Sequence, residues 1–127
     1  MNRTVPAASS FRPFLPSKEF LVSKLFYTRL GFSVTSEWQD GAVLTLGDSS
    51  FILSSFYLKE LAENFMMQLI VPDLDQWWKH IQASKLPETF GVFPPKPPKL
   101  EPSGLTVAYF FDPCSVMWHV TTGEPAK

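Results

Sequence analysis

The feature that most constrains the fold of this chain is a repeated order of predicted elements. From residue 11 the sequence predicts a strand, a helix and three further strands, and from residue 65 it predicts the same order again. Repetition at a spacing of roughly fifty residues is typical of a duplicated structural unit. We therefore expect a single domain, residues 1–127, with one unit at about 11–56, a second at about 65–121, and an N-terminal arm at 1–10.

The first unit is predicted from helical spacing and from turn residues. A strand is expected at residues 11–15, and Ser17 is placed as the N-cap of a helix. Apolar residues recur at helical intervals from Val22 to Leu30, and Gly31 follows at a position where helices end. Turns with an Asp–Gly and a Gly–Asp pair indicate an antiparallel meander, after which a short helix is expected within 57–64. The predicted strands of the meander lie at 32–38, 42–46 and 51–55.

The second unit repeats this order with a proline-rich insertion. Its first strand, at residues 65–71, ends before Asp73, which with Gln76 resembles a capping box that begins a helix. That helix carries Trp77 and Trp78, which we assign to packing. We interpret the run at 94–102 as a stiff connection; its PxxPxK match to adaptor-domain ligands leaves a protein-interaction module as a further alternative. The remaining strands are expected at 89–93, 106–111 and 116–121.

Charge and cysteine content exclude several classes of protein. Eleven Lys and Arg residues against 12 Asp and Glu residues give a net charge of −1, which disfavours nucleic acid as a partner. No apolar stretch approaches the roughly 18 residues that a membrane span needs, so we expect no membrane partner. Cys114 is the single cysteine and cannot form a disulfide within the chain, which favours a cytoplasmic location.

Three segments carry a resemblance to a known family. The sequences FYTRLGF, VPDLDQWW and DPCSVMWHV, in this order, resemble signatures of the vicinal-oxygen-chelate superfamily of glyoxalases, bleomycin-resistance proteins and dioxygenases. The resemblance runs from about Arg12 to Val120 and is closest in pattern to the metal-free bleomycin-resistance-like members. It implies an α+β fold in which two paired βαβββ units form a cup-shaped mixed/antiparallel sheet with helices on its outer face.

The resemblance also identifies the positions at which enzymatic members bind a divalent metal. These positions correspond to Arg12, Ile52 (or Ser54 in a shifted register), Met66 and His119. Only His119 can ligate a metal, because Arg12 is permanently cationic and the aliphatic and thioether side chains carry no charge. We therefore expect no metal or other cofactor and no catalysis. The alternative is a metal-dependent lyase or isomerase of the glyoxalase type with a non-standard site around His119.

Strand alternation places the same positions on the inward faces of their strands. The inward side chains combine apolar groups with a few polar ones, as small-molecule sites do. Trp38, at the end of a predicted strand, is a further candidate for the rim of the groove. The predicted ligand-binding residues are Arg12, Phe14, Trp38, Ile52, Met66, Gln68, Met117 and His119.

These residues predict non-catalytic sequestration of a small organic molecule or drug, in a pocket or a groove between subunits. By resemblance we expect a homodimer, with arm exchange through residues up to about Pro16. Arg12 favours an anionic or carboxylate-bearing ligand. Ser115 stands where the family's turn usually has Gly, so that turn is expected to differ in shape.

Overall fold

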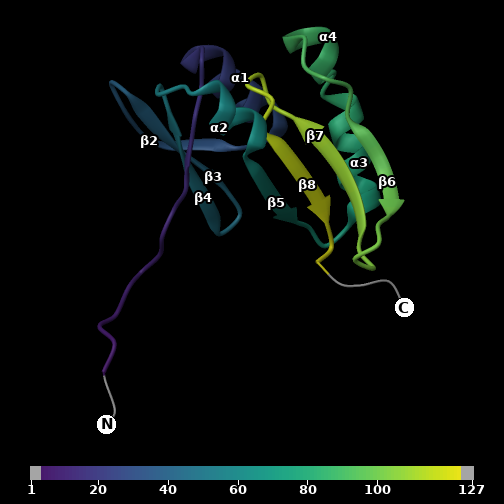
Figure 1. The fold of residues 1–127 in the computed structure, drawn as a ribbon, viewed down its shortest axis with the longest axis horizontal. Coiled ribbons are helices and arrows are strands. Elements are labelled where there is room, and N and C mark those ends of the chain that lie inside the picture. The colour runs from purple at the N-terminus through teal and green to yellow at the C-terminus, as the bar shows by residue number, and fades with distance from the viewer. Residues whose placement is uncertain (1–3, 124–127) are drawn as a thin grey trace.

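The computed structural model describes residues 4–123 and contains two four-stranded sheets of identical strand order (Figure 1). The first sheet has the order β1-β4-β3-β2 and the second has the order β5-β8-β7-β6. In each sheet the first and last strands of the unit pair in parallel, and the remaining pairs are antiparallel. The predicted α+β fold of two βαβββ units is therefore confirmed.

The elements of the first unit are β1 (Phe14–Leu15), α1 (Phe20–Leu30), β2 (Ser33–Trp38), β3 (Gly41–Leu46) and β4 (Ser49–Ser54). A short helix, α2 (Lys59–Asn64), connects the units. Those of the second unit are β5 (Met66–Ile70), α3 (Leu74–Ala83), α4 (Leu86–Phe90), β6 (Lys96–Leu100), β7 (Thr106–Phe111) and β8 (Met117–Thr121). The strand expected at 11–15 is shorter than predicted, although the Pro13 carbonyl still accepts a hydrogen bond from the Ile52 amide.

The start of α1 differs from the prediction. Glu19, not Ser17, is the N-cap residue, and its side chain makes no capping hydrogen bond. Ser17 is buried, and its hydroxyl donates to the Ser54 carbonyl at 2.6 Å, which fastens the chain to β4. The C-terminal prediction is confirmed, because Gly31 is left-handed with φ of 113°. Asp73 is confirmed as the N-cap of α3, since its carboxylate accepts a hydrogen bond from the Gln76 backbone amide at 3.0 Å.

The strand predicted at 89–93 is wrong. Residues 86–90 form α4 instead, with a proline in its first turn, where the missing amide hydrogen is not needed. The strand of this unit is β6, which lies inside the proline-rich run that was interpreted as a connection. It is an edge strand of its sheet. An edge strand tolerates proline because the backbone amides on its outer side have no neighbouring strand to bond to.

One hydrophobic core joins the two units. Buried residues of α1, β3 and β4 belong to the same cluster as those of α3, β7 and β8. At its centre the Tyr27 hydroxyl donates to the Asp112 carboxylate at 2.7 Å and accepts from the Trp118 indole at 3.0 Å. These bonds connect the first helix to the turn after β7 and to β8, so the units cannot separate without exposing polar groups.

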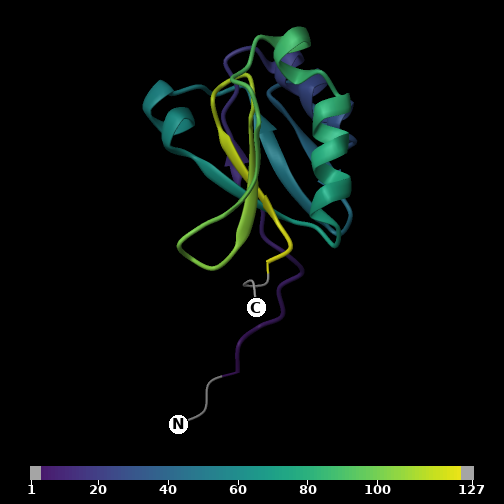
Figure 2. The same ribbon diagram turned by 90° about the vertical axis from the view of Figure 1, so that its right-hand side faces the viewer.

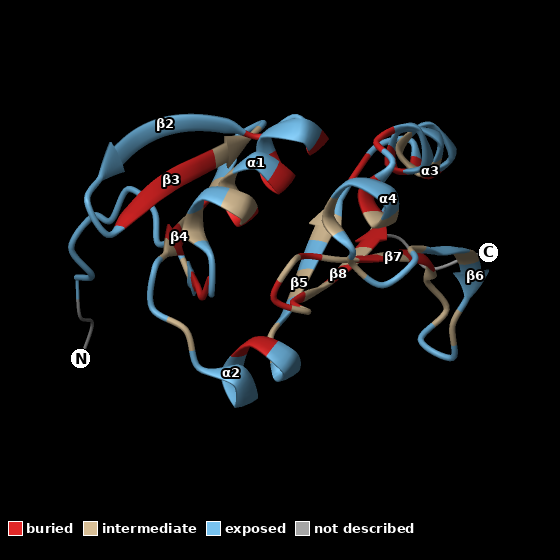
Figure 3. Ribbon diagram, turned by 90° about the horizontal axis from the view of Figure 1, so that it is seen from above, coloured by how far each residue is buried: buried red, intermediate tan, exposed pale blue. Residues whose placement is uncertain are grey.

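The helices leave one face of the second sheet largely uncovered. Figures 2 and 3 show α3 on one side of this sheet and α2 beyond the opposite side. The chain before β1 runs away from both sheets in Figures 1 and 2. None of the helices in the described part of the chain has the length and apolarity needed to cross a bilayer.

Candidate functional site

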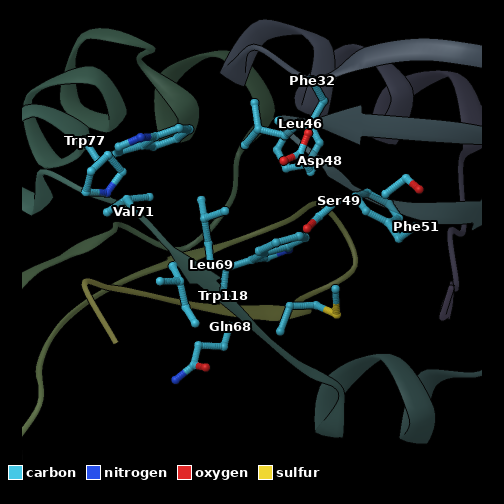
Figure 4. A pocket seen from close by; sticks show the side chains of 15 residues that line it. Phe32, Leu46, Asp48, Ser49, Phe51, Gln68, Leu69, Val71, Trp77 and Trp118 are labelled. Carbon is cyan, nitrogen blue, oxygen red and sulfur yellow. The ribbon is translucent and has the colours of Figure 1, made fainter. Parts of the chain in front are cut away.

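The face of the second sheet that points away from α3, here called the open face, carries half of the predicted site residues. Side chains directly opposite in neighbouring strands lie on the same face. Gln68 pairs with His119, which pairs with Tyr109, which pairs with Lys96, so these four form one row across the sheet. Figure 4 shows Gln68 pointing away from Leu69, as strand alternation requires.

A second row on this face is apolar. Met66 pairs with Met117, which pairs with Phe111, and Phe93 packs edge-on against Phe111 with ring centroids 5.7 Å apart. The Lys96 ammonium lies 6.0 Å from the centre of the Phe111 ring and so connects the two rows. The open face thus presents an apolar surface beside a polar one.

Two cavities lie on this face and share Met117. The lysine cavity, about 700 Å³, is lined by Lys96, Pro97, Pro98, Lys99, Glu101, Tyr109, Met117 and His119. The methionine cavity, about 510 Å³, is lined by Glu63, Asn64, Met66, Phe93, Phe111, Ser115 and Met117. Both volumes fall within the range of small-molecule sites.

His119 is the most unusual group in the lysine cavity. Its Nε2 atom is buried and has no hydrogen-bond partner among the described residues. Its ring packs edge-on against Tyr109 at 4.8 Å. A buried polar atom without a partner costs roughly 1 to 3 kcal/mol, so the site favours any ligand or water that bonds to it.

The charges of the lysine cavity favour an acidic ligand. Lys96 and Lys99 contribute two positive charges against the one carboxylate of Glu101. That carboxylate already accepts a hydrogen bond from the Tyr109 hydroxyl at 3.1 Å. Partial burial, followed by the bond to Glu101, raises the pKa of Tyr109, which therefore stays a neutral donor at physiological pH.

The remaining predicted residues lie in the first sheet or before it. Phe14 pairs with Ile52, and Trp38 pairs with Gly41 on the same face. A Cβ on Gly41 would come within 2.9 Å of the Trp38 ring, so glycine allows the indole to lie against β3. Arg12 is exposed in the segment before β1. None of the cavities described here joins these residues to those of the second sheet.

The four positions inferred for a metal do not fit one. Ile52 lies in the first sheet and Met66 and His119 in the second, while Arg12 precedes both sheets. Within residues 4–123 no three His, Cys, Asp or Glu side chains come close enough to hold an ion. The donor set therefore gives no basis for a metal-dependent step.

Several residues of the open face were missed by the sequence analysis. Lys96 and Lys99 were missed because β6 was interpreted as a connection. Tyr109 and Phe111 lie in a correctly predicted strand, and their alternation with the buried Phe110 could have identified them.

Comparison with known proteins gives consistent similarities. The chain is 28% identical over 117 residues to a bleomycin resistance protein of Klebsiella pneumoniae, covering 88% of this chain and 90% of that protein. The crystal structure of a bleomycin-binding protein in complex with bleomycin superposes with a TM-score of 0.78 at 27% identity, covering 92% of this chain and 100% of that one. A lactoylglutathione lyase from Agrobacterium tumefaciens shares the fold, with a TM-score of 0.67 at 14% identity over 92% and 96% of the two chains. No family model matches the chain.

Proposed function

This chain belongs to the vicinal-oxygen-chelate superfamily, and we propose that it sequesters a small organic molecule without transforming it, on the open face of the second sheet. The observation that carries the proposal is the buried, unpartnered Nε2 of His119 beside a cavity of about 700 Å³. A small turn of the imidazole ring toward the cavity would let a ligand bond to this atom and recover the free energy that its isolation costs.

The ligand we propose has an aromatic or apolar body and an acidic group. Met66, Met117 and Phe111 offer the apolar surface on which such a body would rest. Lys96, Lys99 and His119 would hold the acidic group. Bleomycin is the first drug to test, because the similar proteins named above are bleomycin resistance and bleomycin-binding proteins.

The proposal includes a homodimer in which the first sheet of one chain covers the open face of the other. Apolar side chains on the two faces support it, since Phe14 and Met66 are each 62% exposed in the single chain. Such a pairing would place Phe14, Trp38 and Ile52 opposite the lysine and methionine cavities, and would let Arg12 of the arm reach the ligand. A cytoplasmic location is also part of the proposal; it rests on the single cysteine, Cys114.

The test compares two probes, bleomycin and 2-naphthoate, by thermal shift and calorimetry. Binding to the folded state alone raises the melting temperature with ligand concentration. In His119→Phe, which keeps the ring and removes both nitrogens, we expect the affinity for 2-naphthoate to fall about tenfold, because a hydrogen bond to a charged group is lost.

The matched control is His80→Gln, on α3 and outside both open-face cavities. It should leave the affinity for 2-naphthoate unchanged. Equal affinities in wild type and His119→Phe would contradict the assigned site, and the lack of any shift with either probe would contradict binding of these ligand classes.

A further inference from the structure

A separate cavity of about 400 Å³ lies between the two units, and it shares no lining residue with the lysine or the methionine cavity. Its walls come from the β3–β4 turn on one side and from β5 and the start of α3 on the other. Met67, Leu69 and Val71 contribute to it, and these alternate along β5 with the side chains of the open face. Gln68 and Ile70 line it as well, so the cavity lies at the β5 edge of the second sheet, whereas the lysine cavity lies over β6, β7 and β8.

Aromatic side chains form much of this inter-unit cavity. Phe32, Phe51 and Trp118 pack against one another with ring centroids 5.6 to 5.7 Å apart. In Figure 4, Trp77 and Phe32 lie on opposite sides of the cavity, and Leu69 and Trp118 lie below them in this view. Trp77 is half-buried, so part of its indole remains available for contact. A flat apolar group placed here would contact rings from both units.

A single formal charge borders the cavity, and it is negative. Asp48 lies in the two-residue turn that Gly47 begins with φ of 60°. In the described part of the chain the one ion pair joins Lys24 to Glu37, so the Asp48 carboxylate has no cationic partner there. No lysine, arginine or histidine lines the cavity. An anion would find no complementary charge here, whereas a cation would.

We propose that the inter-unit cavity is a second binding site, which takes a planar aromatic cation. The ring packs against Trp77 and the aromatic cluster, and the ammonium group pairs with Asp48. Ring burial supplies most of the affinity, because an exposed ion pair contributes little. The charge preference is opposite to that of the lysine cavity, so the two sites select different ligands, and this inference does not depend on the proposed function of the open face.

The test titrates the protein with tryptamine and, separately, with indole-3-propionate, which carries the same ring and the opposite charge. The indole N–H signals of the four tryptophans in nitrogen-15 NMR report where each probe binds. We expect tryptamine to shift the signals of Trp77 and Trp118 and to leave that of Trp38, on the first sheet, unmoved.

Two variants examine the cavity without disturbing the core. Asp48→Asn keeps a good turn residue and should weaken tryptamine binding about two- to fivefold, as expected for an exposed ion pair. Asp40→Asn, in the other hairpin turn, should change nothing. Ser49→Phe, at an exposed position on the rim, should block the site, whereas Ser36→Phe on β2 should not.

The proposal is overturned if tryptamine leaves Trp77 and Trp118 unmoved, if Asp48→Asn binds as tightly as wild type, or if indole-3-propionate binds there equally well. A shift confined to Trp38 would also overturn it, because the probe would then occupy the first sheet. Binding of 2-naphthoate to the lysine cavity is measured separately, so either site can fail without the other.

Discussion

Ser115 holds a backbone conformation that residues with side chains seldom adopt. Its φ is 69°, in the turn between β7 and β8, and its amide donates to the Asp112 carbonyl at 2.9 Å. The left-handed conformation costs a non-glycine residue roughly 1 kcal/mol or more. Ser115 also lines the methionine cavity. Serine therefore holds this conformation at a cost, at a position beside the proposed site.

Ser115→Gly should therefore stabilise the protein. We expect the free energy of unfolding to rise by about 0.5 to 1 kcal/mol, since the relief of strain exceeds the added freedom of the unfolded chain. Urea denaturation measures this difference. Ser103→Gly is the control, because Ser103 is a loop residue whose φ is not positive. This substitution should destabilise the protein slightly or have no effect. A loss of stability in Ser115→Gly would show that the hydroxyl, not the backbone, determines this position.

Asp112 is a buried carboxylate at the centre of the core. Burial raises its pKa to about 6, although hydrogen bonds from Tyr27 and from the amides of Val116 and Cys114 act in the opposite direction. The ordinary value is 3.8. Because the folded protein binds this proton more tightly than the unfolded chain, the contribution to stability is complete below pH 4 and is lost as the pH rises through 6.

The pH dependence of stability should report this group. Relative to Asp112→Asn, the wild-type free energy of unfolding should fall by about 2 to 3 kcal/mol between pH 4 and pH 7, as the shift of roughly two pKa units implies. Denaturation of both proteins across this pH range gives the difference between their free energies of unfolding. The contributions of the other carboxylates are the same in both proteins and cancel in this difference. A flat difference curve would contradict the raised pKa.

Among the elements, β6 depends on prolines to a degree unusual for a strand. It pairs with β7 through Lys96 with Tyr109 and Lys99 with Val107, and the register shifts between these pairs, where Pro97 lies. Four of the five residues of this strand line the lysine cavity, namely Lys96, Pro97, Pro98 and Lys99. Proline restricts the unfolded chain and prevents further strands from pairing at the edge. The segment is therefore both a wall of the site and a protected edge.

Replacing Pro97 and Pro98 together by glycine should destabilise the protein by about 2 kcal/mol, because both the stiffness of the unfolded chain and the order of the strand are lost. Amide hydrogen exchange should accelerate at Val107 and Tyr109, which pair with β6. The control is the replacement of Pro94 and Pro95, which precede the strand, by glycine. It should leave amide hydrogen exchange in β7 unchanged. Unaltered exchange in the first variant would contradict a structural role for β6.

The elements also show what sequence reasoning can reach. Gly31, Asp73 and the hairpin turns were identified because each has a local physical signature. The strand of the second unit was predicted at 89–93, where the structure has the end of α4, and it lies instead in the proline-rich run as β6. Prolines argue against a strand unless the strand is known to lie at the edge of a sheet. Strand alternation correctly placed four residues on one face of the second sheet, where they lie opposite one another in neighbouring strands: Met66, Gln68, Met117 and His119. It could not reveal that Phe14 and Ile52 belong to a separate sheet of the same chain, because that depends on tertiary packing.

At the scale of the whole molecule, apolar side chains are distributed unevenly between covered and open surfaces. The single chain buries one continuous core between its units, yet its open face exposes Met66, Ile70 and Phe93, each 62% exposed. Phe14 on the first sheet is exposed to the same extent. Exposed apolar groups concentrated on sheet faces indicate a surface that another molecule covers. The proposed homodimer would cover both faces at once.

A charge at Met66 should therefore separate the subunits. In Met66→Glu, a carboxylate would be buried against the partner's apolar surface, so we expect sedimentation to show a monomer at concentrations where the wild type is a dimer. Leu21→Glu is the matched control, because Leu21 is 66% exposed on the helix α1 and belongs to neither of the two sheet faces that the dimer would cover. It should leave the dimer intact. The wild-type melting temperature should rise with protein concentration and that of Met66→Glu should not. A wild-type protein that sediments as a monomer at all concentrations would contradict the dimer, and the lysine cavity would then have to bind its ligand without a partner.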